Sequence, residues 1–525
     1  MSIEVPLILA IPLTAAFILP VMRRCGRRIS NGIIIGCTIS TLASALLLAW
    51  KVISVGTVTY TFGAADPGIA IPFHSAGVPI RILFVIDPLS ACMIAITAIM
   101  MAVVILFTLQ SDADGTTSDT FYPLLFLMIV GIFGMVQSGD LYNFFIFLEL
   151  NSLAGAALVA TRNNNGLSIE GGLKYAFISA IGGVFLLFAI GMLYGQYNSL
   201  NMAYIASVIT PSNLSLVAFV LIVTTLVMKA GAAPMHFWKP DAYSSGPPVI
   251  TALLIVSSMA SLYAIARITM SLYGTQINMS TIGWCFIALG ILSMIIGVSM
   301  AVIQGDIMRL IAYHSISQIG YMLTALGICL TTLGDHILLD TYGIDALYGG
   351  IYHIVNYTLY NGLLFLVAGT FIYWYNTNSI DKIKGVGKRM KISMIFYLVA
   401  VFSVVGIPPF NGYASKKLMY ESFFAFNPII SAFAIFITCM SLIIFTKVFI
   451  EVVGGESQYP DQERKELPDR MIIGMSILAV LIITIGLFSD QMMTFIIEPA
   501  ARALIDQETY ILSVLGENHL HKITE

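Results

Sequence analysis

Long apolar stretches recur along nearly the whole chain and are separated by short polar loops. A helix that crosses a lipid bilayer needs about 20 mostly apolar residues, so each stretch predicts one membrane span. Fourteen spans are predicted, near residues 5–22, 31–53, 83–109, 121–138, 141–160, 172–194, 214–231, 248–273, 281–303, 308–330, 346–375, 392–425, 428–453 and 470–491. The pattern therefore indicates an all-α polytopic membrane protein.

The sequence also predicts structure in three segments at the ends of the chain and between the spans. The Gly- and Pro-rich connection 54–82 is expected to hold a small hairpin, Thr57–Thr61 against Ile80–Phe84. Residues 492–515 are expected to form an amphipathic surface helix that contacts a partner subunit, because polar residues recur there every four positions. Met1–Pro20 has no basic segment before its apolar run, so we interpret it as the first span and not as a signal peptide.

Basic residues in the short loops predict the orientation of the chain. They gather in the loop after span one and in the loop after span eleven, at Arg23, Arg24, Arg27, Arg28, Lys382, Lys384, Lys388, Arg389 and Lys391. Cytoplasmic loops are enriched in Lys and Arg. We therefore expect loops that follow odd-numbered spans to be cytoplasmic, with both termini outside a prokaryotic cytoplasmic membrane.

Composition supports a membrane protein and excludes several other classes. Of 525 residues, 58% are hydrophobic and only 10% are charged, whereas soluble domains carry roughly 25% charged residues. The net charge of −3 does not favour a nucleic-acid partner. The six cysteines are scattered without a C-x-x-C pair, so we expect no metal site, cluster or other cofactor.

Two spans are interrupted in a similar way. Span seven runs into Lys229-Ala-Gly-Ala-Ala-Pro234, and span twelve contains Gly406-Ile-Pro-Pro-Phe-Asn-Gly412. Paired interruptions of this kind are typical of transporters built from inverted repeats. We therefore expect four regions: N-terminal helices and an external loop (1–120), a first inverted repeat of spans four to eight (121–273), a second of spans nine to thirteen (281–453), and a final helix with surface helix and tail (454–525).

Five ionisable residues lie within apolar surroundings and are candidates for a proton relay: Glu149, Lys174, Lys229, His353 and Lys416. Each has a structural alternative. Lys174 could reach the cytoplasmic surface, Glu149 could form a structural ion pair, Lys229 and Lys416 could cap broken helices, and His353 could be a hydrogen-bonded core residue. Ionisable groups at mid-bilayer cost roughly 2.5–3.5 kcal/mol each, so their recurrence beside two broken helices favours a relay.

Polar residues on span ten and nearby could hold a water wire or could equally form hydrogen bonds between helices. On span ten, Tyr313, Ser317 and Tyr321 share one face, and His314 and Gln318 share another. The candidate water-wire residues are His236, His314, Ser317, Tyr357 and Asn361.

Several long motifs in the chain resemble those of a known family. They are NFFIFLEL, LVMKAGAAPMHFWKPDAYSSGPPVITALL, GDIMRLIAYHSISQIGYM, IYHIVNYTLYNGLLFLVAG and GIPPFNGYASK, and together they cover roughly residues 85–425. The chain resembles the antiporter-like subunits of respiratory complex I, and looks most similar to the D-type subunit of Mrp sodium/proton antiporters and its counterparts in membrane-bound hydrogenases. The resemblance implies a fourteen-span fold with inverted repeats, and functional roles for Glu149, Lys229 and Lys416.

The chain departs from the family pattern at the centre of the relay. The family usually carries a lysine or histidine on span eight, but here SSMASLYAIAR has no base before Arg267. On span eleven the family has a second histidine and then a lysine, where this chain has Tyr357 and Asn361. This leaves His353 as the expected titratable bridge between the halves, with water held by Tyr357 and Asn361.

The sequence is compatible with two functions. The chain is expected to be a proton or sodium/proton translocating subunit of a multisubunit membrane complex, either redox-driven or of the Mrp type. The alternative is a transport-inactive scaffold that docks partner subunits. A redox enzyme in its own right is disfavoured, because neither a Gly-rich nucleotide loop nor cluster-ligating cysteines are present in the sequence.

Overall fold

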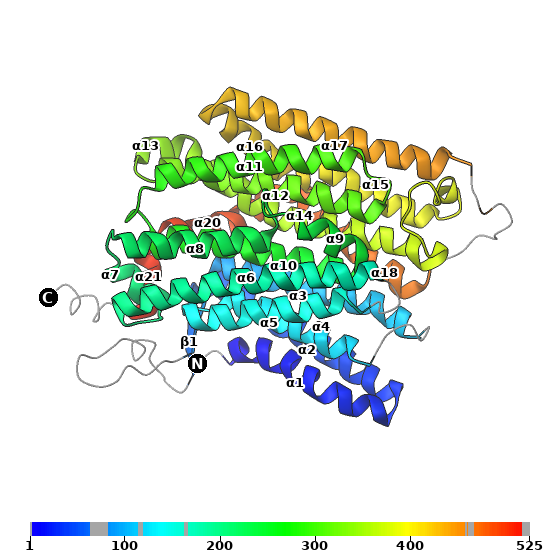
Figure 1. Ribbon diagram of the computed structural model, residues 1–525, viewed down its shortest axis with the longest axis horizontal. Coiled ribbons are helices and arrows are strands. Elements are labelled where there is room, and N and C mark those ends of the chain that lie inside the picture. The colour runs from blue at the N-terminus through cyan, green and yellow to red at the C-terminus, as the bar shows by residue number, and fades with distance from the viewer. Residues whose placement is uncertain are drawn as a thin grey trace.

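The computed structural model describes residues 3–62, 82–113, 119–161, 166–456, 459 and 467–516, and nearly all of these form helices that run side by side (Figure 1). The helices up to the first break are α1 (Glu4–Met22), α2 (Arg27–Val55), α3 (Pro88–Ala113), α4 (Phe121–Gln137), α5 (Leu141–Val159), α6 (Gly166–Tyr197), α7 (Met202–Val208) and α8 (Asn213–Ala230). The middle helices are α9 (Trp238–Ser245), α10 (Pro248–Ala266), α11 (Met279–Val302), α12 (Ile307–Thr332), α13 (His336–Leu338) and α14 (Ile344–Tyr375). The last helices are α15 (Lys391–Val405), α16 (Gly412–Phe426), α17 (Pro428–Gly454), α18 (Asp469–Leu487), α19 (Ser489–Met492), α20 (Glu498–Ile505) and α21 (Gln507–Leu515).

The predicted spans are confirmed. Among the described residues, twelve helical segments are long and apolar enough to cross a membrane, and α4 and α15 are shorter apolar helices. Together these segments account for all fourteen predicted spans. The central spans, α10, α12 and α14, are almost wholly buried by their neighbours, whereas α1 and α2 expose many apolar side chains. Such an apolar outer surface suits a protein that is surrounded by lipid.

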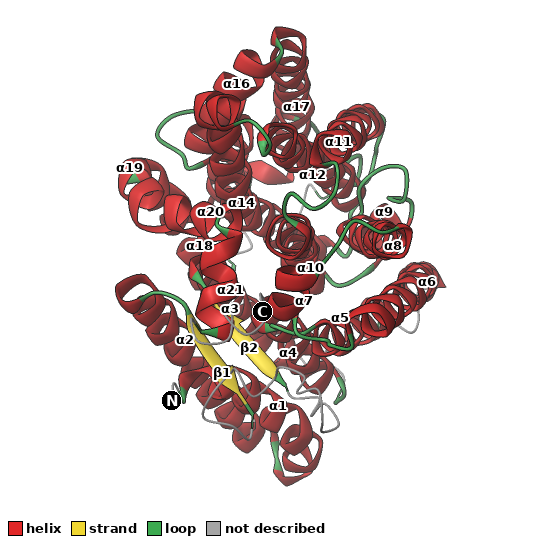
Figure 2. Cartoon of the chain, turned by 90° about the vertical axis from the view of Figure 1, so that its left-hand side faces the viewer, coloured by secondary structure: helices red, strands yellow, loops and turns green. Residues whose placement is uncertain are grey.

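The structure places the start of α1 and the C-terminal helix α21 at the same end of the bundle (Figure 1). The predicted hairpin also lies at this end, as Figure 2 shows. Strand β1 (Val58–Thr61) pairs antiparallel with β2 (Leu83–Ile86), and Val58 lies opposite Ile86. The second strand begins three residues later than predicted, because its position is set by the core, where all four of its residues are buried. Ile80 lies outside the described residues.

Both predicted breaks exist, and each begins at a glycine that ends a helix. Gly231 follows α8 with φ 78°, and Gly406 follows α15 with φ 84°. This left-handed conformation is easy for glycine and strained for other residues, so it is a common end of a helix. The chain then turns into a second, short helix in each case: α9 after the first break and α16 after the second.

The segment 492–515 is not one continuous surface helix, and this part of the prediction is wrong. It divides into the π-helical turn Met493–Ile497, α20 and α21. The division occurs because Asp506 caps the start of α21, accepting a hydrogen bond from the Thr509 amide at 2.9 Å. Buried residues of α20 and α21 pack on the chain's own spans, with α20 against α3 and α14.

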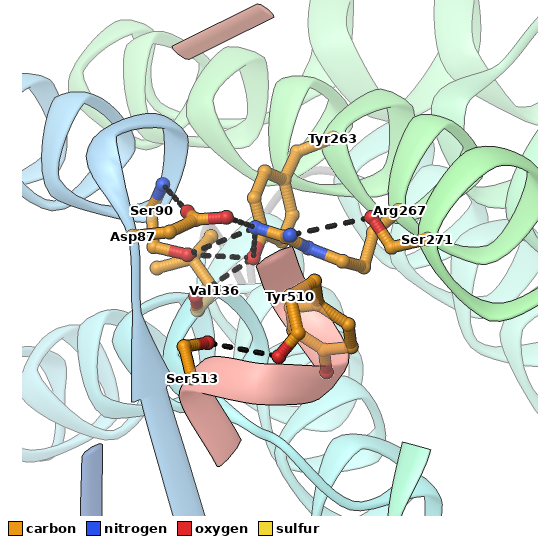
Figure 3. Close-up of polar contacts among 8 residues, drawn as sticks. All are labelled: Asp87, Ser90, Val136, Tyr263, Arg267, Ser271, Tyr510 and Ser513. Carbon is orange, nitrogen blue, oxygen red and sulfur yellow. Dashed lines mark hydrogen bonds and ion pairs between the residues drawn. The ribbon is translucent and has the colours of Figure 1, made fainter. Parts of the chain in front are cut away.

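A buried ion pair joins the end of span eight to the residue that precedes α3, next to α21 (Figure 3). Arg267 Nη2 lies 2.5 Å from Asp87 Oδ2. The Tyr510 ring of α21 lies 5.4 Å from the Arg267 guanidinium. Because arginine cannot release its proton at accessible pH, this cluster holds structure together and does not supply the missing base of span eight.

Candidate functional site

Glu149 of α5 and Lys229 of α8 form an ion pair within two candidate spans. Lys229 Nζ lies 3.3 Å from Glu149 Oε1 and also donates a short hydrogen bond to the Ser152 hydroxyl. The lysine side chain is 4% exposed and the glutamate side chain is 22% exposed. Lys229 is in the last turn of α8, immediately before the break at Gly231.

Two consecutive glycines of α6 make room for this ion pair. A Cβ added at Gly183 would stand 2.6 Å from Glu149 Oε1, and a Cβ added at Gly182 would stand 3.8 Å from Lys229 Cε. Real Cβ atoms almost never approach another atom within 3.0 Å. A side chain at position 183 would therefore push the flexible end of Glu149 away from its place beside α6.

The second break carries the second expected lysine, Lys416 of α16. Its Nζ donates to the Thr438 hydroxyl at 3.1 Å and lies 5.3 Å from the centre of the Tyr321 ring. Lys416 is 1% exposed. Among the described residues, no carboxylate lies within ion-pair distance of it, unlike Lys229.

His353 of α14 connects the neighbourhood of Lys416 to α12. Its Nδ1 lies 3.1 Å from the Ser415 hydroxyl, and Ser415 precedes Lys416 on α16. Its Nε2 lies 3.1 Å from Gln318 Oε1 and 3.3 Å from the Tyr360 hydroxyl. The Gln318 amide nitrogen is 3.2 Å from His314 Nε2, so His314 joins the same network. The histidine thus has a polar partner at each ring nitrogen.

The other predicted water-wire residues are only partly brought together. Ser317 packs against Gly297 of α11, on a different side of α12 from the His314–Gln318 network. Tyr357 shares a hydrogen bond of 2.5 Å with the Ser315 hydroxyl, and Asn361 lies close to Tyr357. Among the described residues, three buried polar atoms here have no hydrogen-bond partner: both polar side-chain atoms of Asn361 and the Ser317 hydroxyl. Buried polar atoms of this kind are usually satisfied by ordered water.

Lys174 and His236 lie apart from the buried lysines. Lys174 is two turns into α6, its side chain is 41% exposed, and it pairs with Glu170 at 2.6 Å and with Asp241 at 2.7 Å. It therefore lies at one end of the bundle and not beside Lys229. His236 is half-buried in the break between α8 and α9; its backbone carbonyl accepts a hydrogen bond from the Lys239 amide at 2.9 Å, but among the described residues no hydrogen bond joins its ring to a lysine side chain.

The ion pairs of Asp241 lie at the mouth of a cavity of about 560 Å³. Arg309 Nη1 lies 2.8 Å from Asp241 Oδ1, opposite the bond to Lys174. Asp306 also lines the cavity, together with residues at the start of α6 and the end of α14. These elements meet at the end of the bundle opposite β1 and α7 (Figure 1), which the basic loops predict to be cytoplasmic.

Sequence reasoning missed a fully buried lysine. Lys239 of α9 is 0% exposed, and its Nζ donates to the Ala230 carbonyl at 3.0 Å and to the Ser258 hydroxyl at 3.4 Å. It was overlooked because HFWKPDAYSSGPP reads as a polar connection and not as part of a span. The signal that could have found it was its place after a helix break, the same place that Lys416 occupies after the second break.

A bundle of long apolar helices, two of them broken beside buried lysines, defines a polytopic membrane protein with an ionisable centre. The chain belongs to the NADH:quinone oxidoreductase/Mrp antiporter transmembrane family, whose model matches residues 138–441. The resemblance read from the sequence motifs is thereby confirmed, and the chain is an antiporter-like membrane subunit of this family.

Individual relatives agree with this assignment. The chain is 29% identical to the N-type subunit of NADH-quinone oxidoreductase of Desulforudis audaxviator over 94% of its own length and 97% of that protein. It is also 29% identical to the D-type Na(+)/H(+) antiporter subunit of Alkalihalophilus pseudofirmus, over 84% of its length and 87% of that protein. In fold, 98% of the chain matches all of a chain of the Mrp complex from Dietzia sp. DQ12-45-1b, with a TM-score of 0.86 and 23% identity.

Proposed function

We propose that this chain translocates protons, or exchanges sodium ions for protons, as one subunit of a larger membrane complex. The observation that carries the proposal is the pairing of Glu149 with Lys229 at the end of broken α8, 3.3 Å apart within candidate spans. Desolvation favours the neutral form of each group and the partner's charge favours the ionised form. A small change in their separation can therefore shift a proton onto or off the lysine.

The proposed relay runs from Glu149 and Lys229 through His353 to Lys416. His353 suits a central position because each ring nitrogen has a polar partner, Ser415 on one side and Gln318 on the other, so a proton can enter at one nitrogen and leave at the other. Water held by Asn361, the Ser317 hydroxyl and His314 Nδ1, which have no hydrogen-bond partner among the described residues, supports proton transfer between them. Lys174 belongs to the cavity mouth with Asp241 in this scheme, and acts on proton access and not at the centre.

The surroundings of the chain follow from the same proposal. The relatives carry the names of subunits, so the chain is proposed to assemble with other membrane subunits. Its place is a prokaryotic cytoplasmic membrane, with both termini outside and the Asp241 cavity facing the cytoplasm. The division into inverted repeats at 121–273 and 281–453 remains part of the proposal. The exposed Phe495, 62% accessible in this chain alone, is a candidate contact for a neighbouring protein of the complex.

A transport-inactive scaffold is the second candidate function. The observation that favours it is the absence of a base on α10, where Ser257, Ser258 and Ser261 lie, together with Tyr357 and Asn361 on α14. A scaffold would keep the fold and dock partners without moving protons.

The two functions are distinguished by changing the ion pair. Glu149→Gln and Lys229→Met are made in the full chain within its complex, with Glu421→Gln as the control, because Glu421 is 64% exposed on α16. The purified complex is placed in lipid vesicles and energised by an imposed sodium gradient or by NADH, whichever drives the unaltered complex. Proton movement, followed with a pH-sensitive dye, should fall roughly 100-fold in both pair variants. Unchanged proton movement with normal assembly would establish the scaffold.

A further inference from the structure

Lys239 has no part in the relay described above, yet its surroundings are unusual for a structural residue. It is fully buried, and among the described residues no carboxylate lies within ion-pair distance of its Nζ. Burying an amine that can become charged is costly unless it is paired, and a charged one costs far more. An apolar residue of the same length would fill the space without that cost.

Lys239 shares four features with Lys416. At each break the lysine Cδ lies over the left-handed glycine: a Cβ on Gly231 would stand 2.6 Å from Lys239 Cδ, and one on Gly406 would stand 3.2 Å from Lys416 Cδ. Each Nζ also bonds a hydroxyl, of Ser258 or Thr438.

The last two shared features concern the neighbouring ring and the helix. Each Nζ faces a tyrosine ring, 5.1 Å from the centre of Tyr243 for Lys239 and 5.3 Å from that of Tyr321 for Lys416. Each lysine is on the helix that follows its break, α9 or α16. Lys239, and not Lys229, is therefore the geometric counterpart of Lys416.

Polar side chains connect Lys239 toward the Glu149–Lys229 pair. Its partner Ser258 is preceded on α10 by Ser257, whose hydroxyl accepts a hydrogen bond of 2.6 Å from the Asn151 amide of α5. The Tyr175 hydroxyl interacts with both Ser257 and Ser152, and Ser152 is bonded to Lys229. Hydroxyl groups can both accept and donate protons, so this side of Lys239 is suited to proton transfer.

Polar side chains also lead from Lys239 toward His353. The Tyr243 hydroxyl lies 2.9 Å from the Ser258 hydroxyl, and the centre of the Tyr243 ring lies 5.9 Å from that of Phe365 of α14. The Tyr357 and Tyr360 rings are 5.9 Å apart, and the Tyr360 hydroxyl reaches Gln318 and His353. Lys239 thus stands between the two halves, where the sequence left a gap.

We propose that Lys239 is the central proton carrier of this chain and replaces the base that is missing from span eight. The inference rests on the proposed function and adds a residue to it. In the transfer step an N–H bond of the Lys229 ammonium breaks and an N–H bond forms at Lys239 Nζ, with the proton passing along the hydroxyl groups of Ser152, Tyr175, Ser257 and intervening water. One positive charge moves, and nothing is oxidised or reduced. A second step of the same kind carries the proton toward His353.

Two substitutions separate this role from a purely structural one. Lys239→Gln and Lys239→Arg both keep donors for the Ala230 carbonyl, but glutamine cannot take up a proton and arginine cannot release one. Lys417→Gln is the matched control, because Lys417 is the exposed lysine next to Lys416, 54% accessible. All are tested as full chains in the complex, in vesicles energised by a sodium gradient or by NADH, with assembly measured on the same preparations.

Proton movement should fall at least about tenfold in both Lys239 variants and stay unchanged in Lys417→Gln, with normal assembly. Normal proton movement in either Lys239 variant, while Glu149→Gln and Lys229→Met are inactive, overturns the inference and leaves the proposed function standing. If the latter two variants are active as well, the proposed function itself fails. If the Lys239 variants do not assemble, the test is a density map of the unaltered complex. Ordered water that joins Lys239 Nζ to the Lys229 side and to the His353 side supports the inference, and a site without water overturns it.

Discussion

Gly183 of α6 lies directly against the carboxylate of Glu149, so closely that a Cβ at this position would stand 2.6 Å from Oε1. Gly183→Val should therefore displace the carboxylate from Lys229, while the charges of both residues are kept. Misplacement of a reacting group by about 1 Å can reduce a rate roughly 100-fold, so proton movement should fall by about that factor.

The matched control is Gly191→Val, because Gly191 is on the same helix and a Cβ there would meet nothing within 4 Å. Both variants are compared for proton movement in vesicles and for recovery of the assembled complex. Equal activity in the two variants would show that the position of Glu149 does not matter.

Replacing His353 should stop proton movement assigned to this chain. The His353→Ala change removes the group that joins Ser415 on α16 to Gln318 on α12 through its two ring nitrogens. We expect a loss of roughly 100-fold, measured in vesicles as above. Thr358→Ala is the control, because Thr358 is buried on the same helix and its hydroxyl donates within that helix, to the Ile354 carbonyl at 2.8 Å. Normal proton movement in His353→Ala, with normal assembly, would contradict a bridging role.

Asn361→Lys should preserve or increase proton movement. By distance and angle, neither polar atom of Asn361 has a hydrogen-bond partner among the described residues, and a lysine there adds a proton carrier one helical turn from Tyr357. Its rate is compared with that of the unaltered complex in the same vesicles. A large loss of activity with normal assembly would contradict the expectation.

The Arg267–Asp87 pair should contribute to stability and not to transport. Removing one member of a buried ion pair leaves the other charge unpaired and typically costs about 3–5 kcal/mol. Arg267→Leu should therefore lower the thermal unfolding temperature of the purified complex, while Arg267→Leu with Asp87→Leu should recover part of the loss. Additive effects of the two changes would show that the pair is not coupled.

The carboxyl group of Asp306, which lines the same cavity as Asp241, should make the stability of the folded protein depend on pH. Burial raises its pKa from the usual 3.8 to about 6. The folded protein then binds this proton more tightly than the unfolded chain. The stabilisation that Asp306 contributes is therefore fully present below about pH 4 and is lost as the pH rises to about 6. Asp306→Asn keeps the helix cap, since asparagine caps helices equally well, and should remove this pH dependence. The check is the unfolding temperature of both proteins between these pH values.

The spans and three of the charged residues could be predicted because the signal lies within one segment. Glu149 and Lys229 interrupt long apolar runs, and Lys416 follows a visible break, so composition alone marks them. The breaks at Gly231 and Gly406 could also be predicted, because glycine and proline alter the local backbone conformation.

The partners of these residues could not be predicted, because they come from distant segments. Lys174 is followed by an apolar span in the sequence, yet Asp241, 67 positions later, holds it at the end of the bundle. Lys239 lies among Trp238, Pro240 and Asp241, which resemble a loop in the sequence, and its partners Ala230 of α8 and Ser258 of α10 become visible only in the fold. The packing of α20 against α3 and α14 likewise joins segments that are far apart in the sequence.

The first break also has a mechanical consequence. Proline has no amide hydrogen, so Pro234 leaves the Ala230 carbonyl without its helical donor, and Lys239 supplies one. The neighbouring Trp238 indole donates to the Met228 carbonyl at 3.0 Å. Two side-chain hydrogen bonds thus join α8 to α9 where an unbroken helix would have its backbone ladder. Separating α8 from α9 breaks these two hydrogen bonds, which costs about 2–4 kcal/mol in total. The electrostatic energy of one added charge can offset a cost of this size, so a proton that reaches this break can change the distance between the two helices.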